Sequence, residues 1–92
     1  MSKPVRAQHH KKPILSLNWH PFQPVIITGS EDKTIGAWDG STGQFLKSYE
    51  GHEKAITDVA WSIDGTAFMS TSLDKEAILW DAHPLVKSPQ EF

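Results

Sequence analysis

The chain has 92 residues, a net charge of -2, no cysteine and four tryptophans. This length accommodates one small domain at most, and the absence of cysteine excludes a disulfide scaffold, a thiolate zinc site and a cysteine nucleophile. The longest apolar runs, such as residues 77–80, are far too short to span a bilayer, and no apolar stretch typical of a secretory signal follows the N-terminal basic residues. We therefore expect an intracellular protein, cytoplasmic or nuclear.

A basic N-terminal arm opens the chain. The first 30 residues carry four basic side chains and no acidic one, whereas the rest carries five basic and eleven acidic residues. Such an arm can bind an acidic partner or nucleic acid, although four cations make a weak phosphate footprint. We expect residues 1–9 to be a solvated arm, and a nucleic-acid or chromatin-binding module is kept as an alternative.

Short strands separated by turn residues follow the arm. The first four expected strands are residues 14–19, 25–29, 34–38 and 44–49. The next three are residues 55–61, 66–71 and 76–80. Helices are disfavoured, because turn and β-branched residues interrupt every stretch with a 3.6-residue period. The inner strands are apolar runs, which indicates sheets covered on both faces.

An internal repeat with a shift of 42 residues underlies this pattern. The shift places residues 10–39 on residues 52–81 without a gap. The identical pairs are His10/His52, Lys12/Lys54, Ile14/Ile56, Trp19/Trp61, Ser30/Ser72, Asp32/Asp74, Lys33/Lys75, Trp38/Trp80 and Asp39/Asp81. Two widely separated tryptophan pairs in one register are hard to obtain by chance. A period near 42 with four strands per unit is typical of a β-propeller blade.

The repeated residues resemble a WD repeat. In the second unit they are Gly51-His52, residues 61–65, residues 70–74 and Trp80-Asp81; in the first they are His10, residues 19–21, residues 28–35 and Trp38-Asp39. The resemblance implies an all-β fold of two four-stranded antiparallel β-propeller blades, part of a larger or oligomeric propeller. The expected boundaries are an arm at 1–9, blades at 10–51 and 52–85, and a tail at 86–92.

The resemblance also implies a hydrogen-bonded tetrad of His, Ser or Thr, Asp and Trp in each blade. The first set is His10, Thr28, Asp32 and Trp38, and the second is His52, Ser70, Asp74 and Trp80. A buried indole N–H needs an acceptor, the hydroxyl supplies it, and the imidazole connects the hydroxyl to the carboxylate. We expect a structural role for both sets, because a fully satisfied buried network rigidifies a fold.

Catalysis and metal binding are the alternatives for these residue types. Asp, His and Ser are the members of a hydrolase triad, but both copies would have a tryptophan against the hydroxyl, and the chain lacks a Gly-x-Ser-x-Gly motif. The five histidines show no zinc-ligand spacing. We therefore expect no enzyme activity, no metal and no cofactor.

The second unit lacks a convincing fourth strand, because Pro84 follows Asp81 closely. The shift of 42 places residues 3–8 where a fourth strand would precede the first unit, so the arm is a candidate outer strand. Trp19 and Trp61 are expected to pack between blades. Propellers typically need about four to eight blades. We therefore expect the chain to assemble as three or four copies, to complete a partner's ring, or to be a fragment of a longer propeller.

The expected function is a non-catalytic scaffold for protein–protein interaction. The upper rim of WD-repeat propellers often binds peptides or proteins, and the matching positions are Pro13, Leu15 and Glu31 in the first unit and Ala55, Thr57 and Leu73 in the second. Leu15 and Leu73 are the most informative, since apolar groups at an exposed rim favour a partner. A self-assembling structural unit without a ligand is the alternative of a different class.

Overall fold

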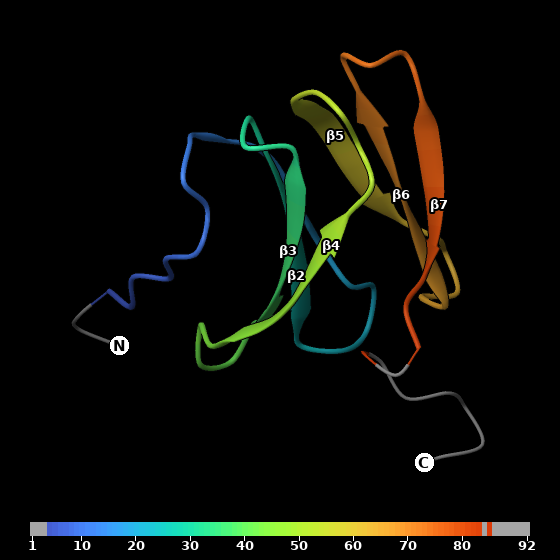
Figure 1. Ribbon diagram of the computed structural model, residues 1–92. Helices are drawn as coiled ribbons and strands as arrows, with labels where there is room; N and C mark the ends of the chain where they lie inside the picture. The colour runs from blue at the N-terminus through green and yellow to red at the C-terminus, as the bar shows by residue number, and fades with distance from the viewer. Residues whose placement is uncertain (1–3, 84, 86–92) are drawn as a thin grey trace.

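The computed structural model describes residues 4–83 and 85, which form seven β-strands (Figure 1). In chain order these are β1 (Ile14–Trp19), β2 (Val25–Ser30), β3 (Thr34–Asp39), β4 (Phe45–Glu50), β5 (Ile56–Trp61), β6 (Ala67–Ser72) and β7 (Ala77–Asp81). Every strand lies within one residue of its expected bounds. No helix in the described part of the chain is long and apolar enough to cross a membrane.

The strands form two antiparallel sheets that follow chain order. The first sheet has the order β1-β2-β3-β4 and the second the order β5-β6-β7. Figure 1 shows the second sheet beside the first, with β5 packed against β1 and β2. The prediction of an all-β fold is confirmed. The second sheet has three strands among the described residues, so the four-stranded prediction holds for the first sheet only.

Matching turns connect the inner strands of both sheets. Lys33 and Lys75 occupy equivalent positions in these turns and have φ angles of 78° and 74°. A left-handed conformation costs a non-glycine residue about 1 kcal/mol or more. The backbone N–H of each lysine donates to the carbonyl of Ser30 or Ser72, at 3.2 and 3.1 Å, which holds both turns in the same shape.

One apolar core joins the two sheets. Its buried members are Val25, Ile27, Ile35, Ala37, Tyr49, Ile56, Val59, Phe68 and Ala82. The Tyr49 ring from β4 meets the rings of Phe68 and Trp80 edge-on, with centroid separations of 5.0 and 5.4 Å. The apolar positions Val25, Ile27, Ile35 and Ala37 in β2 and β3 are therefore explained, because they share the face that packs against the second sheet.

Two polar residues of the first blade, His20 and Asn18, make hydrogen bonds to the second blade. The buried His20 donates from Nε2 to the carbonyl of Gly65 (3.0 Å), and its Nδ1 accepts the backbone N–H of Phe22 and Gln23. Asn18 accepts both the backbone N–H and the indole N–H of Trp61, at 3.0 and 3.3 Å. The prediction that Trp61 packs between the blades is confirmed.

The partner tryptophan has a different environment. Trp19 is 55% exposed and lies beside Ile26 and Trp38, on the face of the first sheet that points away from the second. The arm residues Val5 and Ala7 line the same shallow hollow. Residues 4–9 form no strand within this chain. The packing between blades that the sequence predicted for Trp19 is therefore not present among the described residues.

Candidate functional site

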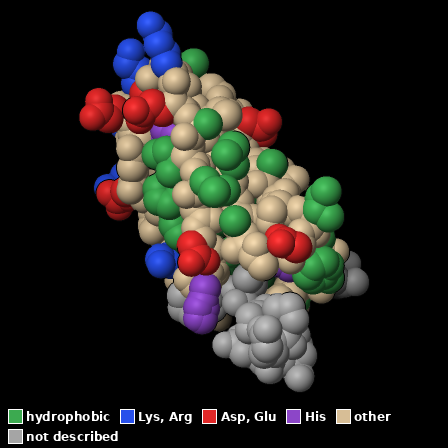
Figure 2. All heavy atoms as spheres, turned by 90° about the vertical axis from the view of Figure 1, so that its right-hand side faces the viewer, with side chains coloured by type: hydrophobic (Ala, Val, Ile, Leu, Met, Phe, Trp, Pro, Cys, Tyr) green, Lys and Arg blue, Asp and Glu red, His purple; other side chains and the backbone are tan. Residues whose placement is uncertain are grey.

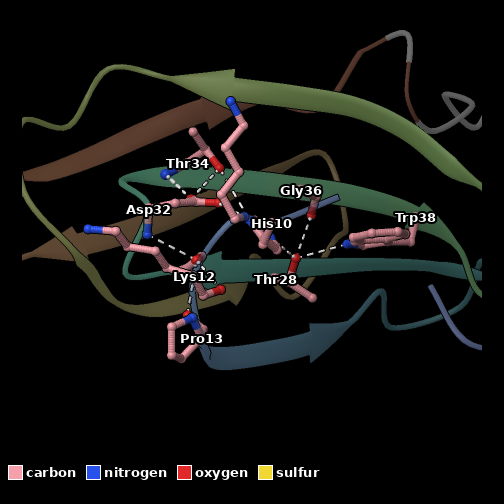
Figure 3. A network of polar contacts seen from close by, with 10 residues as sticks. His10, Lys12, Pro13, Thr28, Asp32, Thr34, Gly36 and Trp38 are labelled. Carbon is pink, nitrogen blue, oxygen red and sulfur yellow. Dashed lines mark hydrogen bonds and ion pairs between the residues drawn. The ribbon is translucent and has the colours of Figure 1, made fainter. Parts of the chain in front are cut away.

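The first tetrad connects four segments of the first blade (Figure 3). His10 comes from the segment before β1, Thr28 from β2, Asp32 from the β2–β3 turn and Trp38 from β3. The distances are 2.8 Å from Trp38 Nε1 to Thr28 Oγ1, 2.7 Å from Thr28 Oγ1 to His10 Nε2 and 2.9 Å from His10 Nδ1 to Asp32 Oδ2. The four side chains that the sequence singled out are thus brought together.

Three donor and acceptor pairs make up this network. The indole N–H of Trp38 has no alternative but to donate, so the Thr28 oxygen accepts it. Thr28 Oγ1 also bonds with His10 Nε2 and lies 3.4 Å from the Gly36 carbonyl, and His10 Nδ1–H donates to the Asp32 carboxylate. The histidine side chain is only 2% exposed. Every polar atom of the network is satisfied in this arrangement, which is the condition for a buried network to stabilise a fold.

The second tetrad repeats the geometry. Trp80 Nε1 donates to Ser70 Oγ (2.9 Å), Ser70 Oγ lies 2.7 Å from His52 Nε2, and His52 Nδ1 lies 2.9 Å from Asp74 Oδ2. The His52 side chain has no exposed surface. Because residues 42 positions apart make the same three bonds, the repeat in the sequence is also a repeat of side-chain chemistry.

Hydrogen bonds hold the Asp32 carboxylate in its charged form. Burial by itself raises the pKa of this group. The Thr34 hydroxyl, at 2.6 Å, and the backbone N–H groups of Lys11 and Thr34 outweigh that effect, with His10 adding a further bond. The pKa of Asp32 is consequently well below its usual range.

Asp74 has one fewer side-chain donor. Burial again raises its pKa first, and the backbone N–H groups of Glu53 and Glu76 together with His52 oppose this. The balance lowers the pKa of Asp74 to about 2. Glu76 stands where the first blade has Thr34 and donates only its backbone N–H. Because the second repeat has Glu76 in place of Thr34, the pKa of Asp74 is lowered less than the pKa of Asp32.

The tetrads are closed to substrate. The central hydroxyl belongs to Thr28 or Ser70, which are 4% and 0% exposed. A nucleophile must reach a reacting atom at about 3 Å, and each hydroxyl here is enclosed by an indole and an imidazole. Within the described ranges 4–83 and 85, no group of three His, Asp or Glu side chains has the spacing to hold a metal ion.

Backbone hydrogen bonds bring the expected rim residues together in pairs. The N–H of Glu31 donates to the carbonyl of Pro13 (3.0 Å), and the N–H of Leu73 donates to the carbonyl of Ala55 (3.1 Å). In each blade the turn before the tetrad Asp is therefore tied to the segment that leads into the first strand. Both turns lie at the upper end of the molecule in Figure 1.

The remaining two rim residues sit at irregularities of the strand pairing. Leu15 lies between Ile14 and Ser16, where the register of β1 against β2 shifts, and Thr57 occupies the equivalent position in β5. Bulges re-aim side chains and occur often at the ends of barrels and next to binding sites. Leu15 is 49% exposed and Leu73 61% exposed.

Sequence reasoning missed three residues of this region. Thr34 reinforces Asp32, and His20 and Asn18 fix the junction between the sheets. The equivalents 42 residues later are Glu76, Ser62 and Ala60, so the repeat offered no signal for any of them. Only the general rule that a buried histidine needs two partners could have drawn attention to His20.

Comparisons with known proteins agree with this geometry. The family described as WD domain, G-beta repeat matches residues 2–39 and 43–81. The probable cytosolic iron-sulfur protein assembly protein Ciao1 of Culex quinquefasciatus is 40% identical over 76 residues, which is 78% of this chain and 22% of that protein. Probable cytosolic iron-sulfur protein assembly protein 1 of Kluyveromyces lactis is 36% identical over 83 residues, or 79% of this chain and 25% of the relative.

A relative with a different name shares the same region. Eukaryotic translation initiation factor 3 subunit I of Drosophila grimshawi is 39% identical over 74 residues, which is 79% of this chain and 23% of that protein. The chain thus spans between a fifth and a quarter of the length of these three relatives. With two matched repeats and seven strands in the corresponding order, the chain belongs to the WD-repeat family.

Proposed function

We propose that this chain is a non-catalytic protein–protein interaction scaffold that binds peptide or protein partners on its upper rim. The rim comprises Pro13, Leu15, Glu31, Ala55, Thr57 and Leu73. The observation that carries the proposal is the exposure of Leu15 and Leu73, at 49% and 61%, beside turns held by backbone hydrogen bonds. Exposed apolar side chains on a rigid frame lose little entropy when a partner covers them.

The tetrads have a supporting part in this proposal. Asp32 and Asp74 each precede the lysine of a positive-φ turn and follow the rim residue Glu31 or Leu73 directly. The hydrogen bonds from His10 and His52 to these carboxylates anchor the turns to the sheets. We therefore assign the tetrads the role of keeping the rim in one conformation.

The names of the relatives support membership of a multi-protein assembly. Two of the quoted proteins are named as assembly proteins and one as a subunit of an initiation factor. We extend this to the present chain as a component of a larger complex. We propose a cytoplasmic location, because two relatives are named as cytosolic; these names offer no support for the nuclear alternative.

The test is selection of binding peptides from a displayed library, followed by measurement of affinity for two double variants. Leu15→Asp with Leu73→Asp places charge on the rim. Leu46→Asp with Ile63→Asp is the matched control, since these side chains are 42% and 95% exposed outside the rim. The first variant should lose binding by about tenfold or more, as expected for losing apolar anchors of 1 to 2 kcal/mol. Equal affinities of the two variants would refute the rim assignment.

Nucleic-acid binding through the arm stays a prediction without an observation in its favour. Arg6, Lys11 and Lys12 are exposed, while Val5 and Ala7 of the same segment face the hollow on the first sheet. An electrophoretic shift at low salt, repeated after replacing Arg6, Lys11 and Lys12 by Gln, decides the matter. Binding that is absent at low salt eliminates this alternative.

A further inference from the structure

The two sheets pack against each other face to face. We call the face by which the second sheet contacts the first the leading face. We call the face by which the first sheet contacts the second the trailing face. Core residues on the leading face are Ile56, Val59 and Phe68, with Trp80 packed against them. Those on the trailing face are Val25, Ile27, Ile35 and Ala37. The shift of 42 residues identifies the counterparts of both faces on the opposite sheet.

No other strand of the described chain packs on the counterparts, which we call the free faces. The free leading face lies on the first sheet and comprises Ile14, Leu17, Trp19 and Ile26, which line the shallow hollow together with the buried Trp38. The free trailing face lies on the second sheet and comprises Ala67, Met69, Ala77 and Leu79. Exposed fractions of Leu17 and Trp19 are 54% and 55%, and those of Met69 and Leu79 are 45% and 67%. Figure 2 views the side of the second sheet and shows hydrophobic side chains gathered there.

The second sheet also ends in an open strand. Among the described residues β7 pairs with β6 alone, whereas its equivalent β3 pairs with both β2 and β4. An open edge presents a row of unpaired backbone N–H and C=O groups that can take up another strand. The described part of this chain contains no fourth strand for it.

The arm has the register that this edge requires. In the first sheet Ala37 pairs with Lys47 and Ile35 with Tyr49, and the shift of 42 converts these pairs into Leu79 with Val5 and Ala77 with Ala7. Pro4 falls on the position of Leu46, which the register shift between Ala37 and Trp38 leaves unpaired. The missing N–H of a proline is therefore tolerated there.

The arm already follows the path of β4 over a neighbouring sheet. Tyr49 near the end of β4 contacts Phe68 and Trp80 of the second sheet. Ala7, its equivalent, lines the hollow with Ile26 and Trp38, which are the equivalents of Phe68 and Trp80. The segment thus lies where the outer strand of a preceding blade would lie, although that blade is not part of the described chain.

We propose that the occupant of both free faces is a second copy of this chain, bound head to tail. The free trailing face of one copy packs on the free leading face of the next, and residues 4–8 of the next copy pair with β7 as its fourth strand. The intramolecular contact between the two sheets is the template, because the same positions meet in both. Such a heterologous contact repeats until a ring closes, at three or four copies. The surface is separate from the rim, so this proposal does not depend on the proposed function.

Cysteine cross-linking tests the register directly, since the chain has no cysteine of its own. Val5→Cys and Leu79→Cys are made as separate single variants, mixed and oxidised. The control mixture combines Leu79→Cys with Arg6→Cys, because neighbouring residues of a strand point to opposite faces. Val5 and Leu79 are 57% and 67% exposed in the single chain, so these substitutions leave its core intact.

The expected product is a mixed dimer that forms at least about tenfold faster for Val5→Cys with Leu79→Cys than for the control, since a disulfide requires Cα atoms within about 7 Å. Equal rates in both mixtures, or no mixed dimer, overturn the proposal. Light scattering provides the second measurement. The native chain should have three or four times its mass of 10.3 kDa, Leu79→Lys should have the single-chain mass, and Ile63→Lys should match the native chain. A native chain of single mass up to about 1 mM contradicts the proposal.

Discussion

The central hydroxyl is the residue-scale node of each blade. Ser70 accepts from Trp80 and donates to His52, so one small side chain satisfies two large buried ones. This connection joins two strands and the segment before β5, because Ser70 lies in β6, Trp80 in β7 and His52 before β5. Thr28 makes the same bonds to Trp38 and His10, so a serine and a threonine hydroxyl both serve at this position.

Replacing Ser70 by Ala should destabilise the chain. The substitution leaves the Trp80 N–H and His52 Nε2 unsatisfied, and an unsatisfied buried polar group costs about 1 to 3 kcal/mol. Urea unfolding followed by tryptophan fluorescence measures the change. Ser70→Thr is the matched control, since threonine occupies this position in the first tetrad. A loss no greater for the alanine variant than for the threonine variant would contradict the role assigned to the hydroxyl.

Acid should weaken the second tetrad in a defined range. The ordinary pKa of 3.8 is lowered to about 2 in Asp74, so its stabilising contribution is complete above about pH 4 and disappears as the pH falls through about 2. The difference in unfolding free energy between the native chain and Asp74→Asn should therefore shrink over this interval. Urea midpoints at successive pH values measure it. A difference that stays constant from neutral pH to about pH 2 is the contrary result.

At the scale of elements, glycine decides how closely the two sheets approach. Gly65 has a φ of +73°, and a Cβ added there would collide with the His20 ring. His20 needs this space because its Nε2 donates to the carbonyl of the same glycine. The turn between β5 and β6 is therefore shaped by its backbone conformation and by a side chain from the other blade together.

Gly65→Ala and Gly43→Ala separate these two effects. Gly43 also has a positive φ, of +79°, but a Cβ there meets only the side chain of Val5, which can move. Left-handed strain of about 1 kcal/mol is common to both variants. The Gly65 variant should lose an additional 1 to 3 kcal/mol or so, because the buried His20 contact is displaced. Urea unfolding of both variants gives the difference, and equal losses would show that the His20 contact contributes nothing.

The strands, the tetrads and the packing of Trp61 could be predicted because their positions repeat, whereas the polar contacts at the junction could not because their residues do not. Pro21, Pro24, Gly43 and Gly65 separate the apolar runs and mark the strand ends to within one residue. His20 has Ser62 as its equivalent, which bonds locally to Asp64 at 2.7 Å. The hydrogen bonds that His20 and Asn18 make between the blades therefore leave no trace in a comparison of the two halves.

At the scale of the whole molecule, the two sheets are unequally protected. β3 is paired on both sides and buries Ile35, Ala37 and Trp38, while β7 has one neighbouring strand among the described residues and exposes Leu79. Local opening is easiest where buried apolar contacts are few. The second sheet is therefore the part of the chain whose stability depends most on what else is bound, and the fourth strand proposed for β7 is the natural source of that dependence.

Hydrogen exchange as a function of concentration tests this link. In dilute solution the amides of β7 should exchange faster than those of β3. Head-to-tail binding would then protect β7 and residues 4–8 together, with exchange about 100-fold slower once the chain concentration is about 100 times the dissociation constant. Leu79→Lys should abolish the concentration dependence and leave the amides of β3 unchanged, because its side chain lies outside the internal core. Protection of β7 that is independent of concentration, or that rises without residues 4–8, contradicts strand addition by a second copy.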